Sequence, residues 1–168
     1  MKSIARSGAV AVALGVLSVV APAATLGAPA PAVSSHKVSL AGKIEAVSST
    51  GKIGVPGVRD TDAGILDGTI SGSPRWHGAV RQVATWGSGL AITSRGTAFA
   101  ANGSLRFTLA GKFTPGPTGI KLTGKLVVTG GTGSYNRAHG TLRVTGTASL
   151  TSGTGESTFD LTGTLRYP

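Results

Sequence analysis

The chain lacks cysteine and has few acidic residues, and each shortage limits its chemistry. Without cysteine it has no disulfide, no thiolate metal ligand and no cysteine nucleophile. Six Asp and Glu stand against 16 Lys and Arg, which gives a formal net charge of +10. This surplus favours contact with anionic surfaces such as cell-wall polymers, nucleic acid or acidic lipids, although it serves solubility equally well.

A long apolar run is also missing. The longest one, residues 9–20, is shorter than the about 20 residues of a comfortable membrane span. It follows Lys2 and Arg6 and precedes a stretch of small residues and prolines at 21–32. This order predicts a secretory signal peptide over residues 1–32, with a retained membrane anchor as the alternative.

Cleavage of this peptide is expected before Val33, with a competing site after Ala23. Removal of the first 32 of the 168 residues leaves 136, enough for a single domain with its own core over residues 33–168. The formal net charge then falls from +10 to +8, because Lys2 and Arg6 leave with the peptide. We therefore expect a secreted, basic, single-domain protein.

Beyond residue 32 the dominant pattern is an alternation of apolar and polar residues, which is typical of half-buried β-strands. Leu105, Phe107 and Leu109, for example, share one face of their segment, while Arg106 and Thr108 share the other. No convincing helical period is present. The expected inner layer consists of Leu40, Ile44, Leu105, Phe107, Leu109, Phe113, Leu122, Leu126, Val144, Phe159, Leu161 and Leu165.

A glycine stands in phase with the apolar face in eight segments, at positions 42, 68, 78, 96, 111, 124, 146 and 163. Glycine inside a strand costs backbone entropy and offers no side chain for packing, so its recurrence asks for a geometric cause. An inward glycine removes a side chain that would collide on the concave side of a curled sheet. The pattern therefore predicts an all-β fold, a small eight-stranded antiparallel closed barrel, with a two-sheet sandwich as the alternative.

Residues 127–144, VVTGGTGSYNRAHGTLRV, combine a strand ending in V-x-G-G-[ST]-G, an aromatic residue two positions later and a glycine that opens the next strand. This motif resembles the allene oxide cyclase and dirigent family of calycin-like barrels, including its secreted bacterial members of unknown role. A turn at Ser71 to Pro74 fits as well, and the resemblance runs from about Leu105 to Tyr167. The matching residues are Val128, Gly130, Gly131, Thr132, Gly133, Tyr135, Ala138 and Gly140.

Within this motif, Gly130, Gly131 and Gly133 are expected to supply positive φ in a tight connection, and Thr132 to bond back to the main chain. Tyr135 is expected to cover one end of the barrel.

The resemblance implies two different roles. Dirigent-like proteins bind reactive aromatic radicals and steer their coupling without forming bonds themselves. Cyclase-like members isomerise an unstable fatty-acid epoxide in an apolar cavity, using a carboxylate and an ordered water. Their cavity cysteine has no counterpart in this chain. The resemblance also implies a homotrimer, and Val83, Phe99 and Val127, apolar at outward positions, hint at such self-association.

The acidic residues offer no predicted catalytic group. Asp67 and Asp160 fall on the outward parity of their strands, which argues against buried acid–base roles. Asp60 and Asp62 are assigned to a long, solvated loop, DTDAGILD. This loop fails as an EF-hand because Ile65 stands where a glycine is required. We therefore predict no catalytic residue, no metal site and no cofactor.

Other motifs are equally negative. His36, His77 and His139 lack the spacing of metal ligands and are expected to be solvated or locally hydrogen-bonded. Residues 119–125, GIKLTGK, mimic a phosphate-binding loop, but Leu126 occupies the Ser/Thr place and the segment has the pattern of a strand. No serine lies in a nucleophile-elbow motif.

Basic residues gather on the predicted outer face of the barrel. Aromatic residues do not alternate with them, so the stacking platform of a single-stranded nucleic-acid binder is missing and no nucleic-acid partner is expected. A solvated positive face and a site for an anionic cell-surface polymer are the two alternatives. The outward basic residues are Lys43, Arg106, Lys112, Lys121, Lys125, Arg143 and Arg166.

The leading functional hypothesis is a secreted, non-catalytic dirigent-like or lipocalin-like barrel that binds a small apolar or aromatic molecule. Eight-stranded barrels are either just filled by side chains or hold one small ligand. The inward glycines favour spare volume, with consumption of that volume by the curvature of the sheet as the alternative. A cyclase-like isomerase and a basic polymer-binding protein are the alternatives. The candidate ligand-binding residues are Trp76, Phe107, Phe113, Tyr135 and Phe159.

Three observations would separate these hypotheses. Dry volume above roughly 300 Å³ inside the barrel would support a ligand. A buried carboxylate facing that volume would favour the enzyme. A filled barrel with salt-dependent binding to cell walls would favour the polymer binder.

Overall fold

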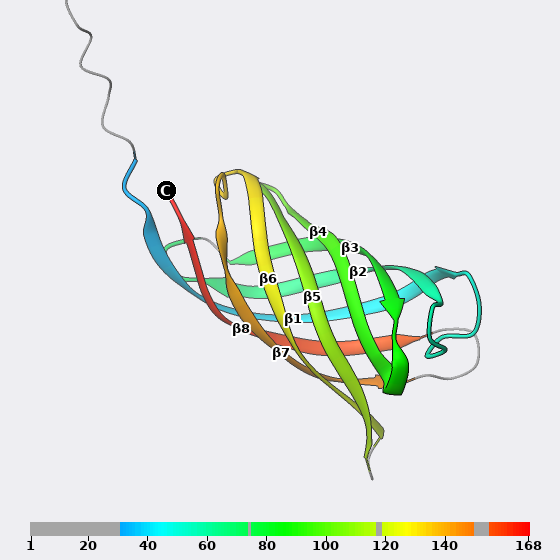
Figure 1. Cartoon of the computed structure of the whole chain (residues 1–168). Coiled ribbons are helices and arrows are strands. Elements are labelled where there is room, and N and C mark those ends of the chain that lie inside the picture. The colour runs from blue at the N-terminus through cyan, green and yellow to red at the C-terminus, as the bar shows by residue number, and fades with distance from the viewer. Residues whose placement is uncertain (1–30, 74, 117–118, 150–154) are drawn as a thin grey trace, which may run out of the picture. The chain divides into compact units, whose positions relative to one another are not determined.

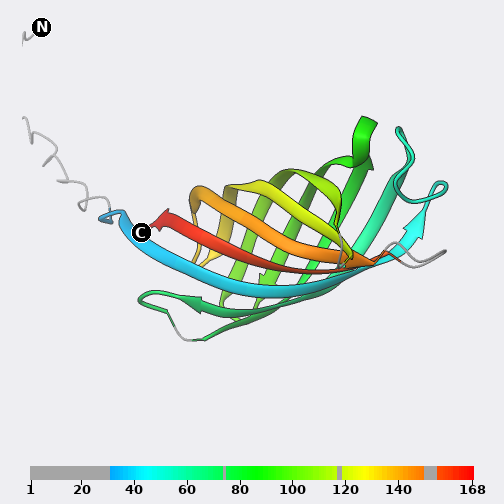
Figure 2. The same ribbon diagram turned by 90° about the horizontal axis from the view of Figure 1, so that it is seen from below.

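Eight antiparallel strands close into a barrel in a computed structural model that describes residues 31–73, 75–116, 119–149 and 155–168. Each strand pairs with its neighbour in the chain, and β1 also pairs with β8 (Figures 1 and 2). The predicted all-β closed barrel is therefore confirmed. The strands are β1 (Ser34–Ser49), β2 (Arg59–Ile70), β3 (Trp76–Trp86), β4 (Ala91–Ala100), β5 (Gly103–Gly116), β6 (Gly119–Gly133), β7 (His139–Ser149) and β8 (Glu156–Tyr167).

The predicted signal peptide falls almost entirely on residues 1–30, which lie outside the described residues. Between residues 31 and 168, the described helical structure is a single short 3₁₀ turn, η1 (Ser88–Leu90), before β4. No helix in the described part of the chain is long and apolar enough to cross a bilayer.

The core lies inside the barrel, where the predicted alternation places it. Ten of the twelve expected inner residues are fully buried, and the other two, Ile44 and Phe159, are half-buried and pack against the same cluster. The intervening residues of β5, such as Arg106, Thr108 and Lys112, are exposed. Period-two alternation thus assigned the faces of this sheet correctly.

The eight in-phase glycines keep the inward parity of their strands, although Gly163 itself is exposed, and neighbouring atoms fill the space beside them. An ideal Cβ on Gly42 would lie 2.5 Å from Leu66 Cδ2 and 2.7 Å from Phe159 Cζ. On Gly124 it would lie 2.7 Å from the Ala110 carbonyl oxygen, on the neighbouring strand. Neighbouring side chains and backbone occupy the space that each missing side chain leaves, so curvature of the sheet, and not a ligand cavity, accounts for these glycines.

Strand β2 begins earlier than the sequence suggests. It starts at Arg59, so Asp60 and Asp62 belong to the strand rather than to a solvated loop. Both share the inward parity of Leu66 and Ile70 and are buried, with 3% and 7% of their surfaces exposed. The loop assignment was therefore wrong, because it followed the low strand propensity of aspartate, which hydrogen-bonding partners inside the barrel offset.

The GGTG motif continues β6 rather than forming the connection. Gly133 has a positive φ of 58°, whereas Gly130 and Gly131 are not among the residues with positive φ. Thr132 Oγ1 accepts a hydrogen bond from the backbone N–H of Ser104 on β5, over 3.2 Å. Tyr135 follows in the β6–β7 connection and is 1% exposed. Its predicted place at one end of the barrel is confirmed.

Candidate ligand site inside the barrel

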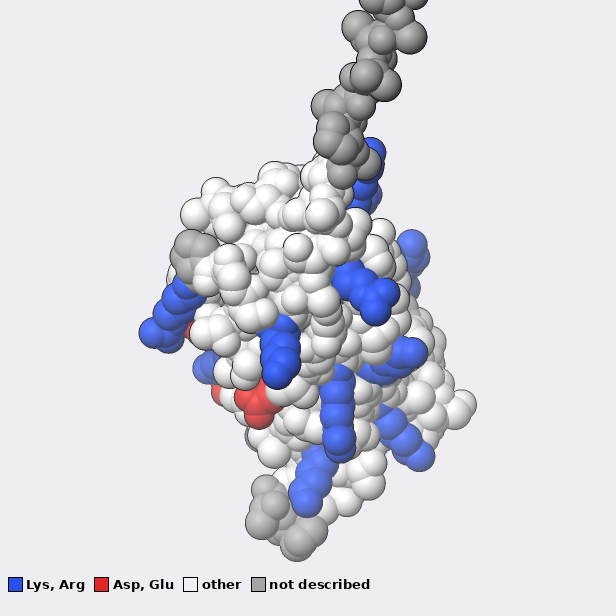
Figure 3. Space-filling view, turned by 90° about the vertical axis from the view of Figure 1, so that its left-hand side faces the viewer, with Lys and Arg blue, Asp and Glu red and all other residues white. Residues whose placement is uncertain are grey.

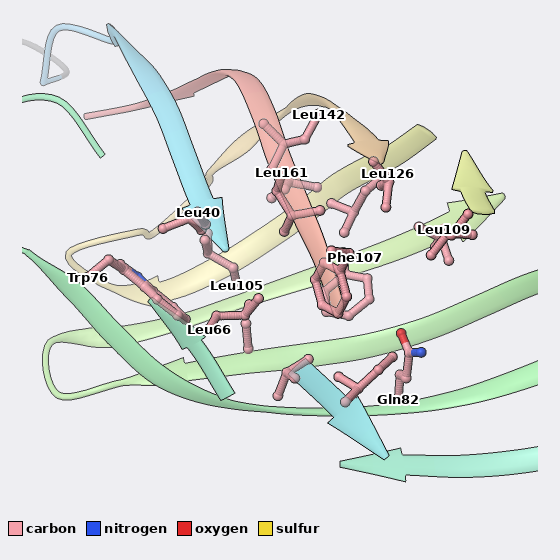
Figure 4. A pocket seen from close by; sticks show the side chains of 17 residues that line it. Leu40, Leu66, Trp76, Gln82, Leu105, Phe107, Leu109, Leu126, Leu142 and Leu161 are labelled. Atoms are coloured by element: carbon pink, nitrogen blue, oxygen red, sulfur yellow. The ribbon is translucent and has the colours of Figure 1, made fainter. Parts of the chain in front are cut away.

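The barrel interior holds a small apolar cavity of about 50 Å³, with Trp76, the first residue of β3, in its wall. All eight strands contribute to its wall, and among the 17 described residues that line it the polar groups are the Gln82 amide and the indole N–H of Trp76. Figure 4 shows the labelled leucines and Phe107 converging on this space, with the Gln82 amide at its edge. The wall is formed by Leu40, Ile44, Leu66, Trp76, Val80, Gln82, Ala98, Leu105, Phe107, Leu109, Leu122, Leu126, Val128, Leu142, Val144, Phe159 and Leu161.

A second cavity of about 40 Å³ lies toward the other end of the barrel, where β1 ends and β2 begins. We call it the acidic mouth, after Asp60 and Asp62 in its wall. Ile44, Gln82, Leu109 and Leu122 line both cavities and therefore form the partition between them. The acidic mouth is lined by Ile44, Ala46, Ile53, Asp60, Asp62, Gln82, Trp86, Ile92, Leu109, Phe113, Leu122, Gly155 and Ser157.

A chain of hydrogen bonds runs across three strands beneath the acidic mouth. Ser94 Oγ on β4 donates to Gln82 Oε1 on β3 over 3.0 Å. Gln82 Nε2 in turn donates to Asp62 Oδ2 on β2 over 2.8 Å. All three side chains are buried. Since Ser94 fixes the amide oxygen of Gln82, the amide nitrogen is directed at the carboxylate.

Asp60 lies two residues before Asp62 on the same face of β2 and has a different partner. The indole N–H of Trp86 donates to Asp60 Oδ2. The other oxygen, Oδ1, is buried and receives no hydrogen bond from any residue that the structure describes. Trp86 also stacks on Phe113, with ring centroids 5.1 Å apart and planes inclined by 26°. The acidic mouth thus combines two carboxyl groups, one with an unpaired oxygen, and an aromatic pair.

Burial sets the ionisation of Asp62. The pKa of its carboxyl group is raised to about 6, chiefly by removal from water and to a smaller extent by the nearby charge of Asp60, while the Gln82 hydrogen bond opposes the rise. A carboxyl group with this pKa is mostly ionised at neutral pH and exchanges a proton close to it. The arrangement is therefore able to hold a hydrogen-bond donor or a cation, or to move a proton.

The structure brings most of the predicted ligand-binding aromatics to this interior. Trp76, Phe107 and Phe159 line the apolar cavity, and Phe113 lines the acidic mouth. Tyr135 lines neither of them and instead packs edge-on against Tyr167, with centroids 5.5 Å apart.

Sequence reasoning missed Asp60, Asp62, Gln82 and Trp86 as site residues. The sequence did contain a signal for the two aspartates. Asp60 and Asp62 each lie an even number of positions before the inward Leu66, so an extended strand places all three on the same face.

The cavity volumes do not reach the size expected of a ligand site. Both are far below the roughly 300 Å³ that would support a bound drug-sized molecule. Inward side chains fill most of the barrel, while buried carboxyl groups, which would favour an enzyme, are present.

The histidines and the outward acids behave as predicted. His36 Nδ1 lies 2.6 Å from the Ser71 carbonyl oxygen, and His139 Nδ1 lies 3.1 Å from that of Arg137. His77 Nδ1 is 2.7 Å from Asp67 Oδ1 on the outer face of the neighbouring strand. Across the described residues no cluster of three or more His, Asp or Glu side chains is suited to a metal ion.

The outer face is strongly basic over much of the barrel. No Asp or Glu occurs between Asp67 and Glu156, a stretch that contains nine Lys and Arg. One side of the molecule therefore shows many basic side chains and few acidic ones (Figure 3). Lys125 of β6 and Arg143 of β7 are paired directly across the two strands. Like charges opposite each other destabilise a sheet, so the stability of the sheet does not explain why Lys125 and Arg143 are paired.

The outward apolar residues occupy two separate rows. Phe99, 48% exposed, is aligned with Ala79 and with Ile65, which is 52% exposed, across β4, β3 and β2. Val83 and Val127 are half-buried and belong to another row, which also contains Arg95.

No protein-family model matches the chain, and no curated protein matches it significantly. Among solved structures, the chain is similar to one described as "Pyocyanin demethylase", with a TM-score of 0.46 and 19% sequence identity. The similarity covers 73% of this chain and 99% of that chain. A likeness this weak carries no functional argument.

Proposed function

We propose that the protein is a secreted, non-catalytic barrel that binds a small apolar or aromatic molecule in its interior. The observation that carries this proposal is the apolar cavity, whose described wall contains two polar groups, the Gln82 amide and the indole N–H of Trp76. Apolar walls with a few placed polar groups are typical of small-molecule sites.

The occupant must be small. An apolar cavity of about 150 Å³ holds one benzene molecule, which is more than either cavity offers. Joined, the two cavities still hold less than this volume, so a ligand with one ring requires the partition formed by Ile44, Gln82, Leu109 and Leu122 to rotate and the surrounding side chains to yield further space. Leucine and isoleucine side chains change rotamer at modest cost, so such an opening is physically accessible.

The test is binding of fluorobenzene, followed by ¹⁹F NMR, to the parent protein and two alanine variants. Ala98 lines the apolar cavity, and Ala98→Val adds two methyl groups to it. Ala79 is exposed on the outer face of β3, so Ala79→Val is the matched control. We expect saturable binding that Ala98→Val weakens at least tenfold and Ala79→Val leaves unchanged. Native mass spectrometry of protein purified from its own culture medium then identifies the natural ligand.

Absence of saturable binding to the parent protein would contradict the proposal. Equal binding by the parent and Ala98→Val would also contradict it, because the probe would then lie outside the barrel.

A proton-transferring isomerase is the second candidate, and the buried Asp62 favours it. A carboxyl group with a pKa of about 6 is suited to general base catalysis near neutral pH. The small cavity argues against a long fatty-acid substrate. The test is cyclisation of a short-chain allene oxide: an enantiomeric excess that Asp62→Asn abolishes would establish catalysis, and a racemic product would exclude it for this substrate.

Binding to an anionic cell-surface polymer is the third candidate, favoured by the acid-free stretch between Asp67 and Glu156. The measurement is the salt concentration that elutes the protein from immobilised teichoic acid. The double variant Lys125→Ala/Arg143→Ala should elute at clearly lower salt than Lys37→Ala/Lys52→Ala, which removes the same charge from exposed positions outside this stretch. If the two variants elute at the same salt concentration, net charge alone explains the binding and this candidate is contradicted.

A further inference from the structure

We propose that the acidic mouth selects ligands that carry a small organic ammonium group, with the ammonium held by Asp60, Asp62 and the Trp86–Phe113 pair. This inference rests on the proposed function, because it names the chemical class of the interior ligand. It goes further in assigning a polar head to a molecule so far described as apolar or aromatic.

The unpaired oxygen of Asp60 is the first observation. The residue is 3% exposed, and its Oδ2 already accepts the Trp86 N–H, while Oδ1 has no partner among the described residues. A buried carboxylate oxygen without a donor is costly, and a ligand that supplies a charged donor removes this cost. Asp60 lines the acidic mouth, so such a ligand approaches Oδ1 from this cavity once the side chains that cover this oxygen move aside.

The balance of charge in the acidic mouth is the second observation. Asp60 and Asp62 are the only titratable residues among the described residues that line it, and no Lys or Arg is among them. The neighbouring donors, the Trp86 indole and the Gln82 amide, are both neutral. Two carboxyl groups therefore share a partly buried space without a counter-ion from the described wall, and a single positive charge complements them.

The aromatic pair is the third observation and separates an ammonium ion from a simple metal cation. Trp86 and Phe113 stack with centroids 5.1 Å apart, and both line the same cavity as the two carboxyl groups. Faces of Trp and Phe attract organic ammonium ions through their quadrupoles. Moreover, no cluster of three metal-ligating side chains occurs among the described residues. The rest of the wall is largely apolar and suits the hydrocarbon part of such a ligand.

The net positive charge of the protein does not prevent this recognition. Most basic side chains lie on the outer face of the barrel, and exposed charges are screened beyond about 8 Å at physiological ionic strength. The buried carboxyl groups are screened less, so the local field inside the acidic mouth remains negative.

The experiment compares benzylammonium with benzyl alcohol and toluene, which share one ring and differ in the head group. Binding is followed by NMR of ¹⁵N-labelled protein, because the Trp86 indole N–H donates to Asp60 and reports directly on the acidic mouth. Its signal is assigned with Trp86→Phe. We expect benzylammonium to bind at least tenfold more tightly than benzyl alcohol at pH 7.5 and to shift the Trp86 indole signal.

Asp60→Asn and Asp62→Asn should each weaken benzylammonium binding at least tenfold. Asp160→Asn removes the same charge from the exposed face of β8 and should leave it unchanged. If the first two variants fail to fold, the parent protein itself supplies the test. Its affinity for benzylammonium should fall as the pH drops through about 6, where the pKa of Asp62 lies, while its affinity for toluene stays constant.

Two results would overturn the inference, and they differ in what they say about the proposed function. If benzyl alcohol or toluene binds as tightly as benzylammonium, the head group is not recognised as a cation, although the interior still binds small molecules. If none of the three binds, the proposed function fails and this inference fails with it.

Discussion

Gln82 directs its amide nitrogen at the carboxylate of Asp62, 2.8 Å away on the neighbouring strand. The bond is buried in the barrel interior, and Ser94 fixes its direction by donating to the amide oxygen. This relationship explains how the fold tolerates an ionisable group inside its core. Substitution of Gln82 should therefore affect the ionised state of Asp62 more directly than any other substitution, because Gln82 is its hydrogen-bond donor.

We therefore expect Gln82→Leu to lower the free energy of unfolding by about 1–3 kcal/mol at pH 7.5, because the Asp62 carboxylate loses its donor while remaining buried. Chemical denaturation with urea measures the change. The loss should shrink at pH 5, where Asp62 is protonated. Ser94→Ala leaves the Gln82–Asp62 bond in place and should cost less. Equal losses for Gln82→Leu at both pH values would contradict this account.

Stability of the parent protein should depend on pH through Asp62. Burial raises its pKa in the folded state to about 6, above the ordinary value of 3.8. The folded state thus binds this proton more tightly than the unfolded state does, so the stabilisation is fully present below about 3.8 and is lost as the pH rises through 6. We expect the contribution to be on the order of 1–2 kcal/mol between pH 4.5 and 7.5.

The measurement is a series of urea denaturation midpoints across that range. Asp62→Asn should flatten the profile, because asparagine does not titrate. Asp160→Asn, on the outer face, should preserve its shape. A parent profile that rises steadily from pH 4.5 to 7.5 would show that another group dominates.

The inward glycines should resist substitution. Gly124→Val and Gly163→Val are expected to lower stability by about 1–3 kcal/mol or more, because the new side chain meets backbone rather than open space. An ideal Cβ on Gly163 would lie 2.4 Å from the Thr141 carbonyl oxygen, and its φ of 156° is unfavourable for other residues. Thr123→Val, on the exposed face of β6, should change stability by only about 0.5 kcal/mol. Glycine variants as stable as the parent would refute the curvature explanation.

We propose that the protein self-associates through the exposed row formed by Ile65, Ala79 and Phe99. Sedimentation velocity should show a trimer for the parent protein and a monomer for Phe99→Lys. Val47→Lys changes an exposed apolar residue elsewhere on β1 and should leave the trimer intact. A clean monomer for the parent protein would end this proposal.

The fold was predictable because β-strand alternation is a local property that needs no partner. The alternation in the sequence alone assigns Leu105, Phe107 and Leu109 to the inner face, and the recurring glycines indicate that the sheet is curved. The site was less accessible, because aspartate in a strand contradicts local propensity. The burial of Asp60 and Asp62 depends on Trp86 and Gln82 across the β2–β3 pair, and such a pairing of distant residues is set by register rather than by composition.

The GGTG motif shows a related limit. Three glycines in four residues are typical of a turn, yet the structure uses two of them as extended strand residues of β6. An ideal Cβ on Gly131 would lie 2.2 Å from the Tyr135 carbonyl oxygen. That glycine therefore permits the close approach of the β6–β7 connection. The φ preference of glycine, which is a local property, does not predict such a contact.

The seam between β1 and β8 has a kinetic consequence. Ser34 pairs with Tyr167, so the first and last strands meet only after nearly the whole domain is available. Contacts between such distant residues slow folding, because the entropy of loop closure must be lost before they form. Until β8 docks, β1 and β7 both present unpaired edges, which are templates for pairing with other chains. A chain that stops before Glu156 would keep both edges open, and we expect it to aggregate rather than to persist as a smaller sheet.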